Sequence, residues 1–261
     1  MTEHTILEVK DLSIGYPKKS TPLLISEAIS FSAQKGELLA IVGGNGVGKS
    51  TLLRSLAKVQ PSLKGSVAIE GRSIQNLTLK QLARKISLVL TEALPTKNLT
   101  VKELIALGRQ PHTNWIGTLS KVDIEKVENA IRQVEMSELL EKKCYELSDG
   151  QLQRVMITRA LAQDTDIIIL DEPTTHLDIY HKAKILKLLK DIAHQSNKLV
   201  IFSSHEIDIA IQLCDKMLVM QDQKVVFGSP KELIESKSFD QLFPEDLILF
   251  DPNTESFKMK S

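Results

Sequence analysis

A glycine-rich segment at residues 43–51, GGNGVGKST, has the composition and spacing of a phosphate-binding loop. It satisfies the pattern G-x-x-x-x-G-K-[ST] with Gly43, Gly48, Lys49 and Ser50. Glycines allow backbone N–H groups to curve around phosphate oxygens, and a following helix adds its positive N-terminal end. Lys49 is expected to reach the β- and γ-phosphates, and the Ser50 hydroxyl to ligate Mg²⁺. The predicted nucleoside triphosphate site comprises Gly43, Gly44, Asn45, Gly46, Val47, Gly48, Lys49, Ser50 and Thr51.

Two adjacent acids complete the chemistry that a phosphoryl-transfer site needs. Asp171 and Glu172 follow an apolar run at residues 166–170 and precede Pro173. Asp171 is expected to hold Mg²⁺ through a water, because ligands bind at the carboxyl edge of such sheets. Glu172 is expected to orient or deprotonate the water that attacks the γ-phosphate. The alternative is an acidic strand end followed by a helix-capping proline.

The elements expected around these residues form an alternating pattern. Apolar or alternating runs predict strands at residues 5–9, 38–42, 66–70, 166–170 and 199–202, and a hairpin of residues 217–220 with 225–227. Apolar stripes at helical spacing predict helices at residues 50–59, 101–107, 123–143, 181–192 and 206–213. Strands alternating with helices indicate an α/β fold with a mainly parallel sheet, and the helical middle is expected to be an insertion. The strand before the glycine segment and the helix after it disfavour a turn that binds nothing.

Composition excludes several other classes of protein. The 261 residues contain 33 Lys and Arg and 33 Asp and Glu, so no overall basic field indicates a nucleic-acid partner. Two cysteines are too few for a disulfide framework. No signal peptide is expected at the start, and no apolar run approaches the ~18 residues of a membrane span. We therefore expect a cytosolic protein whose membrane role, if any, comes through a partner.

A third motif carries a resemblance to a known family. Residues 147–151 read LSDGQ, are followed by LQRVMITRALA, and lie between the glycine segment and the acidic pair. In this order and spacing, the motifs resemble those of ATP-binding-cassette (ABC) ATPases over about residues 5–235. The resemblance implies a P-loop NTPase fold with a RecA-like core, an antiparallel β subdomain and an inserted helical subdomain. It implies one ABC ATPase domain over 1–261: core with β subdomain at 1–90 and 162–235, helical subdomain at 91–161, and a C-terminal tail at 236–261.

The resemblance also implies roles for residues outside the glycine segment. Two cassettes are expected to form a homodimer, with ATP between the glycine segment of one and the signature of the other. Ser148, Gly150 and Gln151 of the signature would face the γ-phosphate across that interface. Since Ser148 opens an expected helix, ordinary helix capping is the alternative for it. Tyr16 matches the aromatic that stacks on adenine, and a surface or core residue is the alternative there. Asp178 matches the residue that contacts the partner cassette, and His205 the switch histidine near the γ-phosphate, which would act with Lys49 and Glu172 as the catalytic set.

Three positions depart from the family pattern. Gly44 stands where the family commonly has Pro, and Asp149 stands where the signature commonly has Gly. The largest departure concerns the glutamine that the family usually has after the strand ending near Val89. Thr91 occupies that position, with Glu92 beside it. Thr91 is too short to span Mg²⁺ and the attacking water, and Glu92 is an open candidate to replace the glutamine.

The helical insertion points to a transport class. Residues 99–112, LTVKELIALGRQPH, resemble the corresponding segment in ATPases of iron(III)–siderophore, haem and cobalamin importers. The expected partners are separate polytopic permease subunits and, indirectly, an extracytoplasmic substrate-binding protein, with the ATPase peripheral on the cytoplasmic face of the inner membrane. Trp115 either lines the groove for a permease helix or packs locally. The alternatives to an importer are an ABC ATPase with another cargo and a non-transport nucleotide switch.

Overall fold

The core of the molecule is a mixed β-sheet between two layers. A computed structural model gives this fold and describes residues 5–17, 21–91, 97–221, 224–240, 242–243 and 247–260. In order across the sheet, the strands are β10 (Lys224–Gly228), β9 (Lys216–Gln221), β3 (Leu38–Gly43), β8 (Leu199–Ser204), β7 (Ile167–Leu170) and β6 (Ile86–Val89). All neighbours are parallel except β10 and β9, which form the predicted hairpin. Strands β3, β7 and β8 are buried along their whole length, as their continuous apolar runs require.

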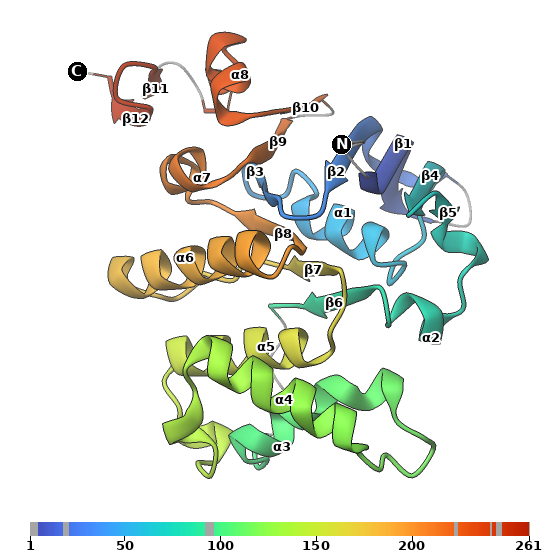
Figure 1. The fold of residues 1–261 in the computed structure, drawn as a ribbon. Helices are drawn as coiled ribbons and strands as arrows, with labels where there is room; N and C mark the ends of the chain where they lie inside the picture. Colours follow the sequence, from blue (N-terminus) through green and yellow to red (C-terminus); the bar gives the residue numbers. More distant parts are fainter. Residues whose placement is uncertain are drawn as a thin grey trace.

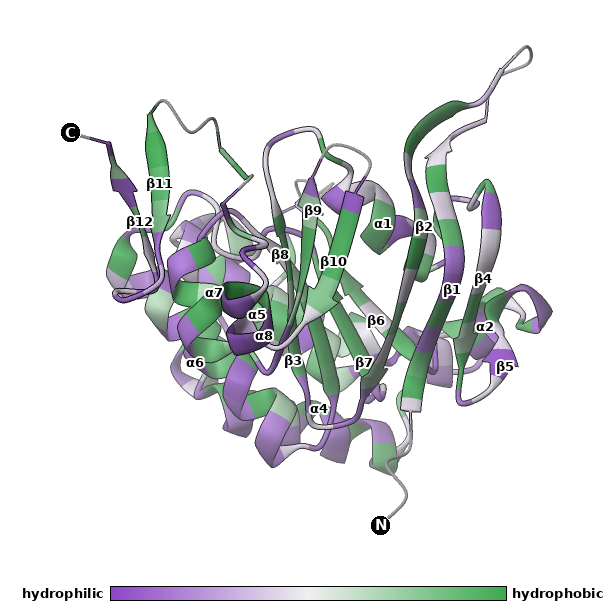
Figure 2. Ribbon diagram, turned by 90° about the horizontal axis from the view of Figure 1, so that it is seen from above, coloured by the Kyte–Doolittle hydropathy of each residue, from purple (hydrophilic) through white to green (hydrophobic). Residues whose placement is uncertain are grey.

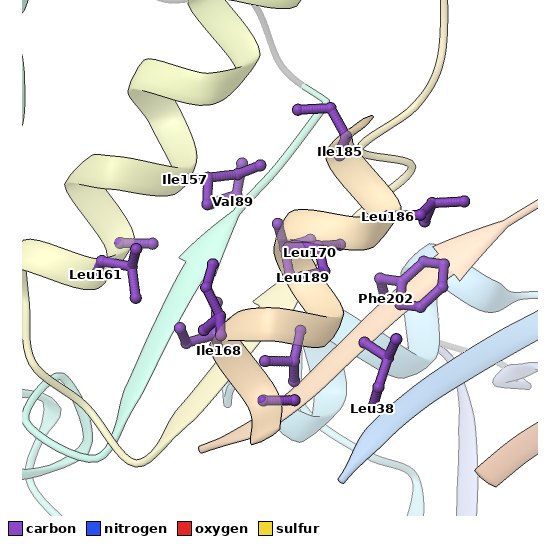
Figure 3. Close-up of a cluster of buried hydrophobic side chains, with 14 of the residues drawn as sticks. Leu38, Val89, Ile157, Leu161, Ile168, Leu170, Ile185, Leu186, Leu189 and Phe202 are labelled. Atoms are coloured by element: carbon purple, nitrogen blue, oxygen red, sulfur yellow. The ribbon is translucent and has the colours of Figure 1, made fainter. Parts of the chain in front are cut away.

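The two faces of this sheet pack against different layers. Because side chains alternate along a strand, Leu38 and Phe202 face one side while Leu39 and Ile201 face the other. The first side packs against α5 (Asp149–Ala162), α6 (Ile179–Gln195) and α7 (Ile207–Leu213), and Figure 3 shows part of this cluster. The second side packs against α1 (Lys49–Leu56) and the N-terminal strands. In Figure 2 the central strands are green, and the surrounding helices carry purple stripes.

The N-terminal strands form a separate antiparallel sheet. Its order is β2 (Leu23–Gln34), β1 (Thr5–Tyr16), β4 (Lys64–Ile69) and β5 (Arg72–Ser73). The sequence pattern predicted β4 and only the first part of β1, and it missed β2. The chain has positive φ at Asp11 in β1 and at Ala28 in β2, and the β1–β2 register shifts along its length. These irregularities interrupt the alternation on which a strand prediction depends.

Helices α3 (Val101–Ala106), α4 (Lys121–Val134) and α5 pack together on the opposite side of the molecule from the N-terminal sheet (Figure 1). The prediction of one helix over residues 123–143 was wrong at its C-terminal end. Helix α4 stops at Val134 because Glu135 adopts a left-handed backbone, with φ of 55°, and a short turn at Ser137–Leu139 follows. Two short helices, α2 (Leu79–Leu82) and α8 (Pro230–Glu235), complete the α-helices of the described residues.

The C-terminal residues form a hairpin that the sequence pattern did not predict. Strands β11 (Ile248–Asp251) and β12 (Ser256–Met259) pair antiparallel. Phe250 lies 5.0 Å from Phe239 and 5.2 Å from Phe257, measured between ring centroids. The Phe257 backbone N–H donates to the Asp208 carboxylate of α7 at 3.3 Å. The hairpin therefore packs beside the helix that follows His205. In the described part of the chain, none of the helices has the length and apolar character needed to cross a membrane.

Candidate active site

The glycine segment joins β3 to α1 and has the backbone geometry of a tight loop. Gly43 and Gly48 have φ of 153° and 104°, which L-residues with a side chain rarely adopt. Neither position has room for a side chain. A Cβ on Gly43 would lie 2.3 Å from the Met220 carbonyl oxygen, and one on Gly48 would lie 2.5 Å from the Ile25 side chain. Gly48 is also the residue that precedes the first turn of α1. The loop thus needs glycine at both positions for its shape and leaves its N–H groups without side chains over them.

Lys49 places its ammonium group inside this loop. The side chain is 5% exposed, and Nζ donates to the carbonyl oxygens of Gly43 at 3.0 Å and Gly44 at 2.9 Å. Burial lowers the pKa of Lys49, and the negative charges of Glu172 and Asp171 partly offset that effect. A buried ammonium group within a loop of backbone N–H groups provides a site for an anion.

Ser50 and Asp171 meet where α1 begins and β7 ends. The Ser50 hydroxyl donates to Oδ1 of Asp171 at 2.9 Å, and the carboxylate is 2% exposed. A hydroxyl and a carboxylate oxygen at this separation suit a hard divalent cation such as Mg²⁺. Among the residues that the structure describes, no group of three or more His, Cys, Asp or Glu side chains could hold a metal by itself. The remaining ligands at this position would have to come from substrate and water, which is how Mg²⁺ is usually held.

Glu172 and His205 form the next contact of the cluster. Nε2 of His205 lies 2.7 Å from Oε1 of Glu172, and the Thr175 hydroxyl donates to Oε2 of the same carboxylate at 3.1 Å. Nδ1 of His205 lies 3.5 Å from Nζ of Lys49. The structure therefore brings together all five chemistry-bearing residues predicted on the core: Lys49, Ser50, Asp171, Glu172 and His205.

Two further hydroxyl groups reach the acids. The Thr91 hydroxyl donates to Oδ2 of Asp171 at 3.4 Å. The Ser203 hydroxyl donates to Oδ1 of Asp171 at 2.8 Å and accepts the backbone N–H of Glu172 at 2.8 Å. Sequence reasoning missed the role of Ser203, although a serine at the end of an apolar run and two residues before His205 was a usable signal. Glu92, the other candidate for the missing glutamine, lies outside the described residues.

The signature residues lie at an exposed helix start. Ser148 accepts the backbone N–H of Gln151, and the Gln151 side chain accepts the N–H of Ser148, which together form a capping box for α5. A Cβ on Gly150 would lie 3.3 Å from the His181 ring. Asp178 caps α6 and contacts His181 at 2.8 Å. Across the described residues, no hydrogen bond joins the signature to the glycine segment.

A cavity of about 280 Å³ links the acids to the signature helix of the same chain. Asp171, Glu172 and Thr91 line one part of it, and Asp149 and Gln153 line another. The core cluster therefore opens toward α5, and the signature residue Asp149 lines the same cavity.

Known proteins that are similar to this chain in sequence and fold are ATP-binding subunits of transporters. The family described as "ABC transporter" matches residues 26–175. The chain belongs to this family. The petrobactin import ATP-binding protein FpuD of Bacillus anthracis is 35% identical over 238 residues, covering 91% of this chain and 86% of that protein. The ferric enterobactin transport ATP-binding protein FepC of Escherichia coli (strain K12) is 33% identical over 253 residues, covering 96% and 92%.

Solved structures of this family have the same fold. A metal-chelate type ABC transporter in an inward-facing conformation is 26% identical, with a TM-score of 0.79 and coverage of 97% of this chain and 95% of that one. A dimeric post-hydrolysis ATP-binding cassette bound to ADP and Pi is 26% identical, with a TM-score of 0.72 and coverage of 86% and 99%. The chain is thus a P-loop ATPase of the ABC type.

Tyr16 lies beside the glycine segment of this ABC ATPase. It ends β1, is 43% exposed, and places its hydroxyl 3.5 Å from that of Thr51. An exposed ring at the margin of the loop is accessible to a flat ligand group. The interpretation of Tyr16 as a core residue is therefore wrong. Tyr16 is a surface residue, and its contact with adenine stays a prediction.

The cassette also has a groove between its core and its helical insertion. This cavity of about 570 Å³ is lined by Leu79, Leu88, Leu107 and Met156, among others. Trp115 lines a neighbouring cavity with Leu79 and is 93% exposed, so its packing alternative is wrong. An apolar hollow beside an exposed tryptophan is typical of a protein-docking surface.

A buried ion pair includes Arg109, whose neighbours Gly108 and Gln110 line this groove. Nε of Arg109 donates to Asp123 at 2.9 Å, and Nη1 donates to the carbonyl oxygens of Ala162 and Gln163 at the end of α5. Hydrogen bonds from Ser120, followed by that from Arg109, lower the pKa of Asp123 to about 2. The LTVKELIALGR segment therefore fixes the C-terminal end of α5 through Arg109.

Proposed function

We propose that this chain is the ATP-hydrolysing subunit of an importer for iron(III)–siderophore, haem or cobalamin cargo. The geometry that supports it most strongly is the contact of Ser50, Asp171, Glu172 and His205 around the lysine of the glycine loop. FpuD and FepC, each matched over at least 86% of both lengths, are by name a petrobactin import and a ferric enterobactin transport ATP-binding protein. We propose the same division of the chain as the sequence implied: core and β subdomain at 1–90 and 162–235, helical subdomain at 91–161, and tail at 236–261.

The glycine segment and the residues around it would bind Mg·ATP. The N–H groups of the segment and Lys49 would hold the β- and γ-phosphates, and Tyr16 would stack on adenine. Ser50 and Asp171 would hold Mg²⁺, which when bound supplies charge neutralisation for the leaving phosphate. Because Lys49 already lies within the loop, ATP binding would transfer its hydrogen bonds from the carbonyl groups of Gly43 and Gly44 to phosphate oxygens.

The acids supply the chemistry. Glu172 would accept a proton from the attacking water, and His205 would direct that carboxylate and face the γ-phosphate. Oε1 of Glu172 is engaged by His205 and Oε2 by Thr175, so the carboxylate direction is fixed before substrate arrives. Preorganised groups of this kind cost little reorganisation during the reaction.

A second copy would complete the site. Ser148, Gly150 and Gln151 would contact the γ-phosphate bound by the partner, and Asp178 would contact the partner chain. Ser148 and Asp178 are exposed at the start of α5 and α6 and make no hydrogen bond to their own glycine segment among the described residues, which supports this arrangement. The relative bound to ADP and Pi is itself a dimer.

The groove beside Trp115 would receive a polytopic permease, and an extracytoplasmic binding protein would deliver the cargo to that permease. The subunit would then lie peripherally on the cytoplasmic face of the inner membrane. The apolar lining of the groove would contact the permease. The ion pair from Arg109 to Asp123, with the bond from Arg109 to the end of α5, would transmit that contact to the signature helix.

The test is uptake in cells lacking this chain. Labelled iron(III)–siderophore, haem and cobalamin are supplied separately, and we expect loss of uptake for one cargo. Wild type should restore that uptake, and Glu172→Gln should not. Normal uptake of all three, together with purification of the chain on ribosomes or DNA, would overturn the importer role.

A further inference from the structure

Ser203 stands out as a polar side chain at the end of the buried strand β8. Its side chain is 0% exposed, and in strand alternation it follows Leu199 and Ile201 on the sheet face that packs against α1. Asp171 follows Ile167 and Ile169 on the same face of β7. The two strands thus deliver a hydroxyl and a carboxylate to one point above the start of α1.

The Ser203 hydroxyl contacts both acids at once. It donates to Oδ1 of Asp171 at 2.8 Å and accepts the backbone N–H of Glu172 at 2.8 Å. A hydroxyl supplies one donor and can accept at the same time, so both bonds are compatible. No other side chain in the described residues bonds to Asp171 and to Glu172 together.

The backbone at Glu172 explains why this bond is needed. Strand β7 ends at Leu170, and Glu172 turns out of the sheet with φ of 47°. A left-handed backbone is strained for a non-glycine residue, and an N–H that is removed from water needs an acceptor. The Ser203 hydroxyl accepts this N–H after the strand ladder has ended, and it thereby stabilises the turn that aims the Glu172 side chain.

The second bond determines how Asp171 is held when Ser50 takes another partner. Oδ1 of Asp171 accepts from Ser50 at 2.9 Å as well as from Ser203. Ser50 would turn to Mg²⁺ when nucleotide binds, whereas Ser203 is enclosed in the sheet and has no such ligand. Ser203 would then remain as the fixed donor to that oxygen, because Thr91 reaches only Oδ2 and at 3.4 Å.

We propose that Ser203 is a positioning residue, whose hydroxyl sets the direction of the Asp171 carboxylate and of the Glu172 backbone for hydrolysis. This inference rests on the proposed ATPase chemistry of Glu172. Ser203 lies too deep to touch nucleotide, so it acts through the two acids.

The experiment compares Ser203→Ala with Ser87→Ala in the full chain. Ser87 is a matched control because it is also 0% exposed in the same sheet, and its hydroxyl accepts from Thr165 instead of from an acid. We expect Ser203→Ala to lower kcat about tenfold, equivalent to ~1.4 kcal/mol, with KM for ATP changed less than about twofold. Ser87→Ala should leave kcat within about twofold, while both variants lose similar thermal stability.

A measurement without nucleotide tests the contact directly. Hydrogen exchange at the Glu172 amide should be at least about tenfold faster in Ser203→Ala than in wild type, and unchanged in Ser87→Ala. Ser203→Thr retains the hydroxyl and should recover kcat. If the alanine variant does not fold, Ser203→Cys takes its place, since a thiol is a weak donor and should lower kcat with KM retained.

Equal kcat in Ser203→Ala and Ser87→Ala would overturn the proposal, as would an unchanged Glu172 amide. Failure of the proposed function gives a different result. A wild-type chain that hydrolyses no ATP would contradict the proposed function. Faster exchange of the Glu172 amide in Ser203→Ala would still establish the contact of Ser203 with Glu172.

Discussion

The acid cluster and the signature turn are both predicted to face a phosphate, but the structure holds them in opposite ways. In the acid cluster, Asp171 is buried and accepts three hydroxyl groups, and Glu172 contacts both Thr175 and His205. At the signature turn, Ser148 is exposed, and its side-chain bond is the capping bond of its own helix. One half of the site is preorganised by its own chain, and the other half presents its groups to solvent.

This difference assigns the two regions to different steps. Groups that must act on a developing charge are worth most when fixed and shielded from water. Groups that must close onto a ligand from a second molecule have to remain accessible until it arrives. We therefore expect changes in the cluster to alter chemistry, and changes at the turn to alter assembly.

The largest effect is expected from Glu172→Gln. Loss of the proton acceptor should reduce ATP hydrolysis by about 100-fold or more, because general-base catalysis typically contributes 10²–10⁴. ATP binding should be retained, since Lys49 and the glycine loop are unchanged. Steady-state turnover and nucleotide titration measure the two effects, with Glu125→Gln on the exposed face of α4 as the control. Unchanged turnover would remove Glu172 from the mechanism.

Arg109→Met should have the next largest effect, which is a loss in the free energy of unfolding. It leaves Asp123 buried without its cation and frees the carbonyl groups at the end of α5. Removing one partner of a buried pair costs ~3 kcal/mol, which chemical denaturation would measure. A loss below about 1 kcal/mol would show that the pair does not anchor the signature helix.

The acid limb of stability provides an independent check on that pair. The pKa of Asp123 is lowered to about 2, so its contribution is complete above the unfolded value of ~3.9 and is lost as the pH falls toward 2. The stability difference between wild type and Asp123→Asn should therefore shrink between about pH 5 and pH 2. A difference that stays constant over this range would mean that the carboxylate charge is not what stabilises the fold.

A smaller effect is expected at Ser148, where two substitutions distinguish helix capping from recognition of the phosphate. Asp and Asn are both good caps and have the same shape, so Ser148→Asp and Ser148→Asn should unfold at similar temperatures. A carboxylate opposite the triphosphate would repel it, and we expect turnover about tenfold lower for the Asp variant, equivalent to ~1.4 kcal/mol. Equal turnover of the two variants would limit Ser148 to capping.

The smallest effect is expected from Thr91→Val. The bond from Thr91 to Asp171 is 3.4 Å long and therefore weak. We expect kcat to change by less than about threefold, or ~0.7 kcal/mol. A loss of tenfold or more would mean that Thr91 performs the role of the absent glutamine.

The sequence was informative where a local pattern determines the structure. The glycine segment, the apolar strands and the two acids predicted the core and its cluster, because each depends on neighbouring residues. The end of α4 depends on a left-handed Glu135, and the C-terminal hairpin depends on contacts with Phe239 and α7, neither of which has a local signal. Ser203 had a local signal, but its partners could not be predicted locally, because they lie 31 and 32 residues away, just past the end of the neighbouring strand β7.

The most direct test of a site shared between two copies is to mix two variants, each of which is impaired in a different half of the site. Ser148→Asp chains retain Glu172, and Glu172→Gln chains retain Ser148, so a mixed dimer contains one intact site. In an equal mixture under saturating Mg·ATP, random pairing should restore hydrolysis to about a quarter of the wild-type rate, because half of the dimers are mixed and each has one working site. A mixture no more active than the sum of its two components would contradict the shared site.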